Sequence, residues 1–145
     1  MDNQYLLNIH PPERATDAQG SGAYGAPRGA RTHNGIDLAC YPGSAICAIR
    51  PGSVTKIGYP YQPNDPDKSH FRYVQITDPA GYRLRYFYVT PCVNINDVIH
   101  VGQIIGYTQR LSDVYPGITD HVHFEVMRNP GEYLDPRNFL TGMAR

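Results

Sequence analysis

The sequence contains no tryptophan, no surplus of either charge and only three cysteines. Cys40, Cys47 and Cys92 are odd in number and form no Cys-x-x-Cys pair. The pattern therefore predicts neither a disulfide framework nor a thiolate zinc site, and we expect three free thiols. Lysine plus arginine and aspartate plus glutamate number 13 each. Because a chain without net charge has no overall field that draws it onto nucleic acid, we expect no nucleic-acid partner.

Long apolar segments and targeting signals are also absent. No stretch approaches the roughly 20 apolar residues that a membrane helix needs, so no membrane insertion is predicted. The first residues lack the basic region and the small-residue cleavage site of a secretory signal peptide. We therefore expect a cytoplasmic product, unless the protein is released by lysis or carried in a virion.

The amino-terminal segment differs in composition from the rest of the chain. Residues 11–30 are rich in Gly, Ala, Pro, Arg and Ser without a period, which is typical of an extended arm or loop. We divide the chain into an extended N-terminal arm at residues 1–19 and a single domain at residues 20–145. A disordered tail is the alternative for the arm, whereas an ordered arm suggests that an assembly partner holds it.

Glycine, proline and tyrosine are abundant, with 14, 13 and 12 copies in 145 residues. This composition favours short strands joined by turns, and the length suits one domain. We predict a mainly β fold, a single antiparallel β-sheet domain whose short loops form a groove. A β-hairpin is expected at residues 73–77 and 82–89, with the tyrosines at 82, 86 and 88 covering one face. Residues 59–72 should be a surface loop that forms one wall of the groove.

The stretch with the most chemistry is His-Val-His-Phe-Glu at residues 121–125. Its alternation predicts a strand that presents His121 and His123 on one face and turns Val122 and Phe124 into a core. Two imidazoles on a rigid, half-buried element suit a metal site or a catalytic site.

A second stretch, His-Asn-Gly-Ile-Asp at residues 33–37, offers matching ligand types. In an extended chain His33 and Asp37 would lie about 13 Å apart, too far for one zinc ion with bonds of about 2.0–2.2 Å. Gly35 can adopt backbone angles that fold the histidine back. Two histidine nitrogens and one carboxylate oxygen would then form a zinc site with an open fourth position, as catalytic sites have. Strand parity leaves open whether His121 or His123 is the second histidine ligand.

Six motifs, in order, resemble those of the lysostaphin-like (LytM-type) zinc endopeptidases. The family has His-x-Gly-x-Asp, a Gly-x-Val turn, Tyr-x-His-Leu, a Val-x-x-Gly-x-x-Ile-Gly hairpin, His-x-His-Phe-Glu and a closing Asp-Pro-x-x-Phe/Tyr-Leu. The matching stretches here are residues 33–37, 52–54, 86–89, a hairpin ending at 106, 121–125 and 135–140. The resemblance spans about residues 20–140 and implies the duplicated hybrid motif fold of that family.

The resemblance also implies a set of roles. Zn²⁺ would be bound by His33, Asp37 and His123, while His121 would assist the attacking water or stabilise the tetrahedral intermediate. The implied partner and substrate is a bacterial peptidoglycan peptide, cut in the stem or the cross-bridge. One position departs from the family, because Tyr88 stands where Tyr-x-His-Leu has its catalytic histidine. A phenol with a pKa of about 10 is no base at neutral pH, but it can donate a hydrogen bond to an oxyanion.

The same tyrosine occurs in one branch of the family. Residues 87–91 and 114–118, followed by His-Val-His, resemble the leukocyte cell-derived chemotaxin branch, secreted signalling proteins that keep the zinc ligands and are regarded as non-peptidases. The disulfides of that branch are not reproduced here. Two hypotheses follow. One is a zinc endopeptidase with His121 and Tyr88 as catalytic groups, delivered by lysis or at the tip of a phage tail. The other is a catalytically silenced zinc-binding module, either structural or binding a partner or cell-wall peptide.

Overall fold

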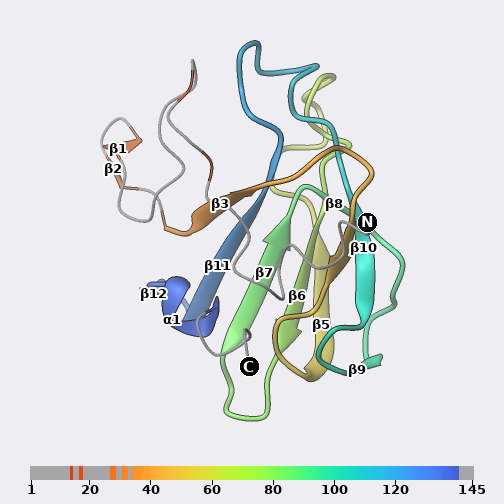
Figure 1. The fold of residues 1–145 in the computed structure, drawn as a ribbon, viewed down its shortest axis with the longest axis vertical. Coiled ribbons are helices and arrows are strands. Elements are labelled where there is room, and N and C mark those ends of the chain that lie inside the picture. Colours follow the sequence, from red (N-terminus) through yellow and green to blue (C-terminus); the bar gives the residue numbers. More distant parts are fainter. Residues whose placement is uncertain (1–13, 15–16, 18–26, 29–30, 33, 141–145) are drawn as a thin grey trace.

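The computed structural model describes residues 14, 17, 27–28, 31–32 and 34–140 of the chain (Figure 1). These residues form short strands and one helical turn. The elements are β1 (Pro27–Arg28), β2 (Arg31–Thr32), β3 (Ile36–Ala39), β4 (Ala45–Cys47), β5 (Gly52–Gly58), β6 (Tyr73–Thr77), β7 (Arg83–Phe87), β8 (Val89–Pro91), β9 (Val98–Ile99), β10 (Ile104–Thr108), β11 (His121–Asn129), β12 (Glu132–Leu134) and α1 (Arg137–Leu140).

The strands form one large sheet and two small ones. The large sheet has the order β12-β11-β7-β6-β5-β9, and β3 also pairs with β11. The three-stranded sheet has the order β4-β10-β8, and β1 pairs with β2. Every pairing among the described strands is antiparallel. The predicted mainly β, antiparallel fold is therefore confirmed.

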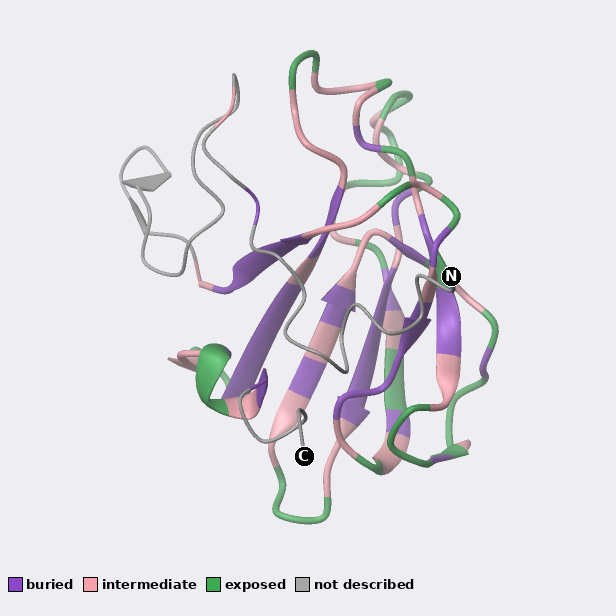
Figure 2. Ribbon diagram, in the orientation of Figure 1, coloured by how far each residue is buried: buried purple, intermediate pink, exposed green. Residues whose placement is uncertain are grey.

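The core lies between the large sheet and the three-stranded sheet, and strands of both are buried in Figure 2. Val122 and Phe124 of β11 are fully buried, as their alternation with the histidines predicts. Tyr86 of β7 packs its ring against Phe124 with centroids 5.2 Å apart. Its hydroxyl accepts a hydrogen bond of 3.0 Å from the Ile49 N–H, next to β4, and so links the two layers. Buried phenol groups need such a partner.

The predicted hairpin is present as β6 and β7, and its turn follows from local chemistry. The Asp78 carboxylate accepts hydrogen bonds from the backbone N–H groups of Ala80 and Tyr82, at 3.0 and 2.9 Å. Gly81 has a φ of 92°, which is the left-handed region that glycine adopts without steric cost. The buried positions of β7 then alternate with partly exposed ones.

The aromatic face predicted for residues 82, 86 and 88 is wrong. Strand β7 ends at Phe87, and Tyr88 has a φ of 69°, which reverses its side-chain direction relative to a strand. Tyr86 is therefore a core residue, not part of a surface cover. Tyr88 is held by its N–H, which donates to the Arg72 carbonyl at 2.7 Å, and by its carbonyl, which accepts from the Gln109 N–H at 2.8 Å. Left-handed non-glycine residues cost about 1–3 kcal/mol and concentrate at functional sites.

Two loops rise from the same end of the large sheet, at the top of Figure 1. The first, residues 59–72, is the predicted surface loop, and the second covers residues 109–120. Gln109 joins them, because its side-chain amide donates to the His70 carbonyl at 2.9 Å and accepts from the Arg72 N–H at 2.9 Å. A polar cleft opens between the loops, lined by Pro66, Asp67, His70, Thr90, Gln109, Arg110, Asp113 and Val114.

Three further predictions bear on the chain as a whole. Cys40, Cys47 and Cys92 are free, as expected. No helix in the described part of the chain is long and apolar enough to cross a membrane. Most of the proposed arm at residues 1–19 lies outside the described residues, so the boundary at residue 20 stays a prediction. Only Arg14 and Asp17 of that arm are described.

Candidate active site

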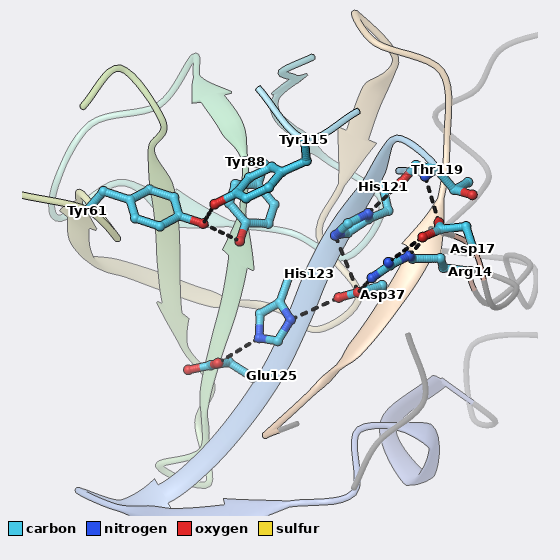
Figure 3. A network of polar contacts seen from close by, with 10 residues as sticks. All are labelled: Arg14, Asp17, Asp37, Tyr61, Tyr88, Tyr115, Thr119, His121, His123 and Glu125. Carbon is cyan, nitrogen blue, oxygen red and sulfur yellow. Dashed lines mark hydrogen bonds and ion pairs between the residues drawn. The ribbon is translucent and has the colours of Figure 1, made fainter. Parts of the chain in front are cut away.

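Strand β11 brings the candidate site together, because it lies between β3 and β7. His123 is opposite Asp37 of β3 on one side and opposite Phe87 of β7 on the other. His121 is two residues earlier and opposite Ala39. Since alternate residues of a strand share a face, both imidazoles lie on the side away from Val122 and Phe124. The sheet register thus places Asp37 beside the two histidines (Figure 3).

Asp37 contacts both histidines through different oxygens. Its Oδ1 lies 3.0 Å from His123 Nδ1, and its Oδ2 lies 3.4 Å from His121 Nε2. The carboxylate side chain is only 3% exposed. His33, the third predicted ligand, lies outside the described residues, so the structure unites two of the three predicted zinc ligands and adds His121.

Glu125 completes the surroundings of His123. Its Oε1 lies 2.8 Å from His123 Nε2, while its Oε2 accepts a hydrogen bond from Arg85 Nη1 at 3.4 Å. Arg85 Nε in turn donates to Gln75 Oε1 at 2.8 Å. Sequence reasoning placed Glu125 in the motif without a role. The signal was its position two residues beyond His123, since residues i and i+2 of a strand share a face.

The two histidines have opposite electrostatic character. Burial lowers the pKa of His121, and the nearby Asp37 charge opposes that shift only in part. Burial alone would also lower the pKa of His123, but hydrogen bonds to Asp37 and Glu125 outweigh it and raise the pKa to about 9. His121 is therefore neutral at pH 7. Its Nδ1–H donates to the Thr119 carbonyl at 2.7 Å, which leaves Nε2 as an acceptor, the form that a general base needs.

Tyr88 belongs to a cluster of three tyrosines beside His121. Its ring meets the His121 ring edge to face, with centroids 5.7 Å apart. Its hydroxyl lies 3.4 Å from the Tyr61 hydroxyl, which forms a shorter hydrogen bond of 2.6 Å with Tyr115. Burial raises the pKa of Tyr88 to about 12, so its phenol stays protonated and remains a donor at neutral pH. Tyr61 and Tyr115 were not predicted, because only the fold brings the two loops together.

Two residues from the N-terminal segment also reach the site. Arg14 Nη1 donates to Asp37 Oδ2 at 2.9 Å, and the Arg14 N–H donates to the Asp37 carbonyl at 2.7 Å. Asp17 accepts from Arg14 Nε and Nη2 at 2.9 and 2.7 Å. Sequence reasoning assigned both residues to the arm and missed them. Their only signal was a pair of opposite charges three residues apart in the sequence.

Two of the described donor atoms lie near the spacing of zinc ligands. In a tetrahedral site with bonds of about 2.0–2.1 Å, neighbouring donor atoms lie about 3.3 Å apart. Asp37 Oδ1 and His123 Nδ1 are separated by 3.0 Å, close to that spacing. The second nitrogen of His123 already faces a carboxylate, the usual support of a metal-binding histidine. The part of the chain that the structure describes holds no set of three or more metal-binding side chains, and His33 lies outside it.

The fold and this site define a lysostaphin-like peptidase domain. The family model described as peptidase family M23 matches residues 31–136, and the chain belongs to this family. The predicted family resemblance is thereby confirmed. Because the matched segment contains residues 33–37 and 121–125, both candidate ligand motifs lie inside the family domain.

Known proteins similar to the chain include both animal proteins and bacterial enzymes. Leukocyte cell-derived chemotaxin-2 of Bos taurus is 30% identical over 112 residues, which cover 77% of this chain and 71% of that protein. The structure described as LytU has a TM-score of 0.65 at 26% identity, covering 83% of this chain and 81% of that one. The catalytic domain of lysostaphin from Staphylococcus simulans has a TM-score of 0.65, and the match covers 97% of this chain and 98% of that chain. At 23% identity, this last likeness shows the fold alone.

Proposed function

We propose that the protein is a zinc-dependent endopeptidase that cleaves peptide bonds in bacterial peptidoglycan. The observation that carries this proposal is the arrangement of Asp37, His123 and Glu125, with the neutral His121 beside them. Asp37 and His123 present two donor atoms close to the spacing of a zinc site, and Glu125 orients the histidine. His33 would be the third ligand, as the family motif implies.

The residues of this chain would divide the work of peptide hydrolysis. When bound, zinc supplies Lewis-acid chemistry by making water more acidic and polarising a carbonyl group. His121 Nε2 accepts the proton of the attacking water, because the hydrogen bond to Thr119 keeps the other nitrogen protonated. The Tyr88 hydroxyl donates to the developing oxyanion. Its hydrogen bond to Tyr61 at 3.4 Å is long, so little is lost when the hydroxyl turns toward substrate.

A second candidate function is a silenced zinc-binding module that holds a partner or a cell-wall peptide. Tyr88 favours it, since a phenol replaces the histidine of the family and its hydroxyl contacts that of Tyr61, which in turn is hydrogen-bonded to Tyr115. The chain is also similar to leukocyte cell-derived chemotaxin-2, whose name describes no peptidase. Release by lysis, a virion-associated role and a partner for the arm remain predictions from the sequence.

Zymography on purified peptidoglycan tests the two candidates. We expect clearing by the full chain, loss of clearing with a chelator and recovery on addition of Zn²⁺. Asp37→Ala is the matched inactive control, because it removes one proposed ligand. A chain that binds zinc but never clears peptidoglycan would support the silenced module. A chain that binds no zinc would contradict both functions.

A further inference from the structure

We propose that Arg14 and Asp17 form a positioning pair that holds Asp37 as a metal ligand through one oxygen. The inference rests on the proposed zinc site and extends it to the N-terminal segment. Neither residue would touch the metal or the substrate. Their role would be to fix the rotation of the Asp37 carboxylate before a metal arrives, which raises metal affinity because no ordering is left to be done.

The two oxygens of Asp37 have different partners. Arg14 Nη1 binds Oδ2 at 2.9 Å, whereas Oδ1 faces His123 Nδ1 at 3.0 Å. Rotation of the carboxylate would break the contact with Arg14. Since Arg14 also donates its backbone N–H to the Asp37 carbonyl, the side chain and the main chain of one residue are both held. This arrangement leaves Oδ1 directed at the place where a metal would meet His123.

Asp17 connects Arg14 to the segment that precedes β11. Asp17 forms a two-pronged ion pair with Arg14, and its Oδ2 accepts a hydrogen bond from the Thr119 N–H at 2.7 Å. Thr119 is the residue whose carbonyl binds His121. The Arg14 side chain is 3% exposed and that of Asp17 is 13% exposed. The two charges stay together, because separating them would leave a largely buried charge without its counter-charge.

The charges of the pair indicate whether Arg14 positions Asp37 or blocks the zinc ion. A lone guanidinium beside Asp37 could occupy the place of the metal charge and repel zinc. Here Arg14 lies between Asp17 and Asp37, and Asp17 takes two of its donors. The positive charge of Arg14 is therefore shared between Asp17 and Asp37 and does not face Asp37 alone. Arg14 also contacts Oδ2, not the space between Oδ1 and His123.

Zinc affinity of the full chain tests the pair, measured by competition with a chromophoric chelator. We expect Arg14→Gln to weaken zinc binding by roughly 10–100-fold, the usual effect of losing an outer partner of a ligand. Arg14→Lys should recover part of that affinity, since it restores the charge without the planar fork. Arg128→Gln is the matched control, because Arg128 makes an exposed ion pair with Glu132 near the end of β11 that does not pair with β3, and it should leave affinity unchanged.

Asp17→Asn provides a second, independent variant if Arg14→Gln fails to fold. It keeps the shape but leaves the Arg14 charge unbalanced, so we again expect weaker zinc binding. If Arg14 instead blocked the site, both variants would bind zinc more tightly than the wild type, and the proposal would be overturned. Variants with unchanged zinc affinity but a lower melting temperature would also overturn the proposal, because the pair would then stabilise the fold without positioning Asp37. If the wild type binds no zinc, the proposed zinc site itself is refuted. That result differs from the two outcomes above, in which the wild type binds zinc and only the positioning role fails.

Discussion

At the scale of single residues, Tyr88 decides between the two candidate functions. Its backbone adopts φ of 69°, and its half-buried ring lies against His121. Such a conformation is costly for tyrosine, so the surrounding contacts must hold it. The result is a protonated hydroxyl at one end of the site, which can donate a hydrogen bond but cannot accept a proton at neutral pH.

Replacing Tyr88 tests this role directly. If the hydroxyl stabilises an oxyanion, Tyr88→Phe should lower peptidoglycan turnover by roughly 10²–10³-fold with unchanged zinc content. Tyr41→Phe, at a position 76% exposed, is the control for loss of a phenol. Turnover is measured by release of peptide ends from purified peptidoglycan. Cleavage that survives Tyr88→Phe would rule out the proposed role, and cleavage gained only by Tyr88→His would identify a silenced peptidase.

The assignment of the histidines is a separate prediction. We expect about one zinc per chain, and its loss when His33, Asp37 or His123 is replaced by alanine. His121→Ala should keep the metal, because His121 is assigned to proton transfer. Elemental analysis of the purified variants gives the metal content. Zinc lost from His121→Ala but kept by His123→Ala would reverse the assignment.

At the scale of elements, the close approach of β3 to β11 depends on Gly35. A Cβ built there would collide with the Phe124 carbonyl oxygen and lie 3.0 Å from both Glu125 Cβ and His123 Cε1. Any side chain at this position must therefore push β3 away from the histidine strand. Glycine was predicted here for its backbone freedom, but Gly35 is not among the glycines with a positive φ, and the reason that the structure gives is the lack of space.

We expect Gly35→Ala to destabilise the fold by roughly 3 kcal/mol, the upper range for overpacking, and to weaken zinc binding. Gly131→Ala is the matched control. Its φ of 79° makes alanine strained, yet nothing lies within 4 Å of the added Cβ. Denaturant unfolding should show a loss of stability for both variants, whereas zinc affinity should fall only for Gly35→Ala. Equal zinc affinity in the two variants would show that β3 can shift without disturbing Asp37.

Elements with a clear local pattern could be predicted from the sequence. The alternation in residues 121–125 predicted β11, and the Asp-Pro-Ala-Gly turn predicted the β6–β7 hairpin. The end of β7 at Phe87 could not be predicted, since Tyr88 is turned by contacts with Arg72 and Gln109 from other loops. Arg14 and Asp17 were missed for the same reason. Their partners lie 23 and 102 residues away in the chain.

At the scale of the whole molecule, the site is a set of buried charges carried on a well-packed sheet. The charges alternate in sign along one connected network, in the order Asp17, Arg14, Asp37, His123 and Glu125. In the metal-free protein the protonated His123 lies between Asp37 and Glu125 and offsets part of their negative charge. Because a zinc ligand must be deprotonated, metal binding should release the proton from His123.

The pH dependence of stability follows from the two histidines. The pKa of His123 is raised from its ordinary 6.5 to about 9, so its proton stabilises the metal-free fold fully below pH 6.5. This contribution, on the order of 3 kcal/mol, is lost as pH rises from 6.5 to 9. Burial lowers the pKa of His121, so below pH 6.5 the unfolded chain binds a proton there more readily than the folded protein, and stability falls as pH falls. Stability of the metal-free protein should therefore be greatest near pH 6.5.

Denaturant unfolding between pH 5 and 9, with and without zinc, measures this behaviour. Above pH 6.5 the metal-free protein should become less stable, while stabilisation by a fixed zinc concentration should increase, because less proton competes for His123. His123→Gln should flatten the change between pH 6.5 and 9 and abolish the effect of zinc. Arg128→Gln, again the exposed control, should leave both curves unchanged. A wild-type protein whose metal-free stability rises steadily to pH 9 would show that His123 is not protonated between its two carboxylates, and the electrostatic account of the site would fail.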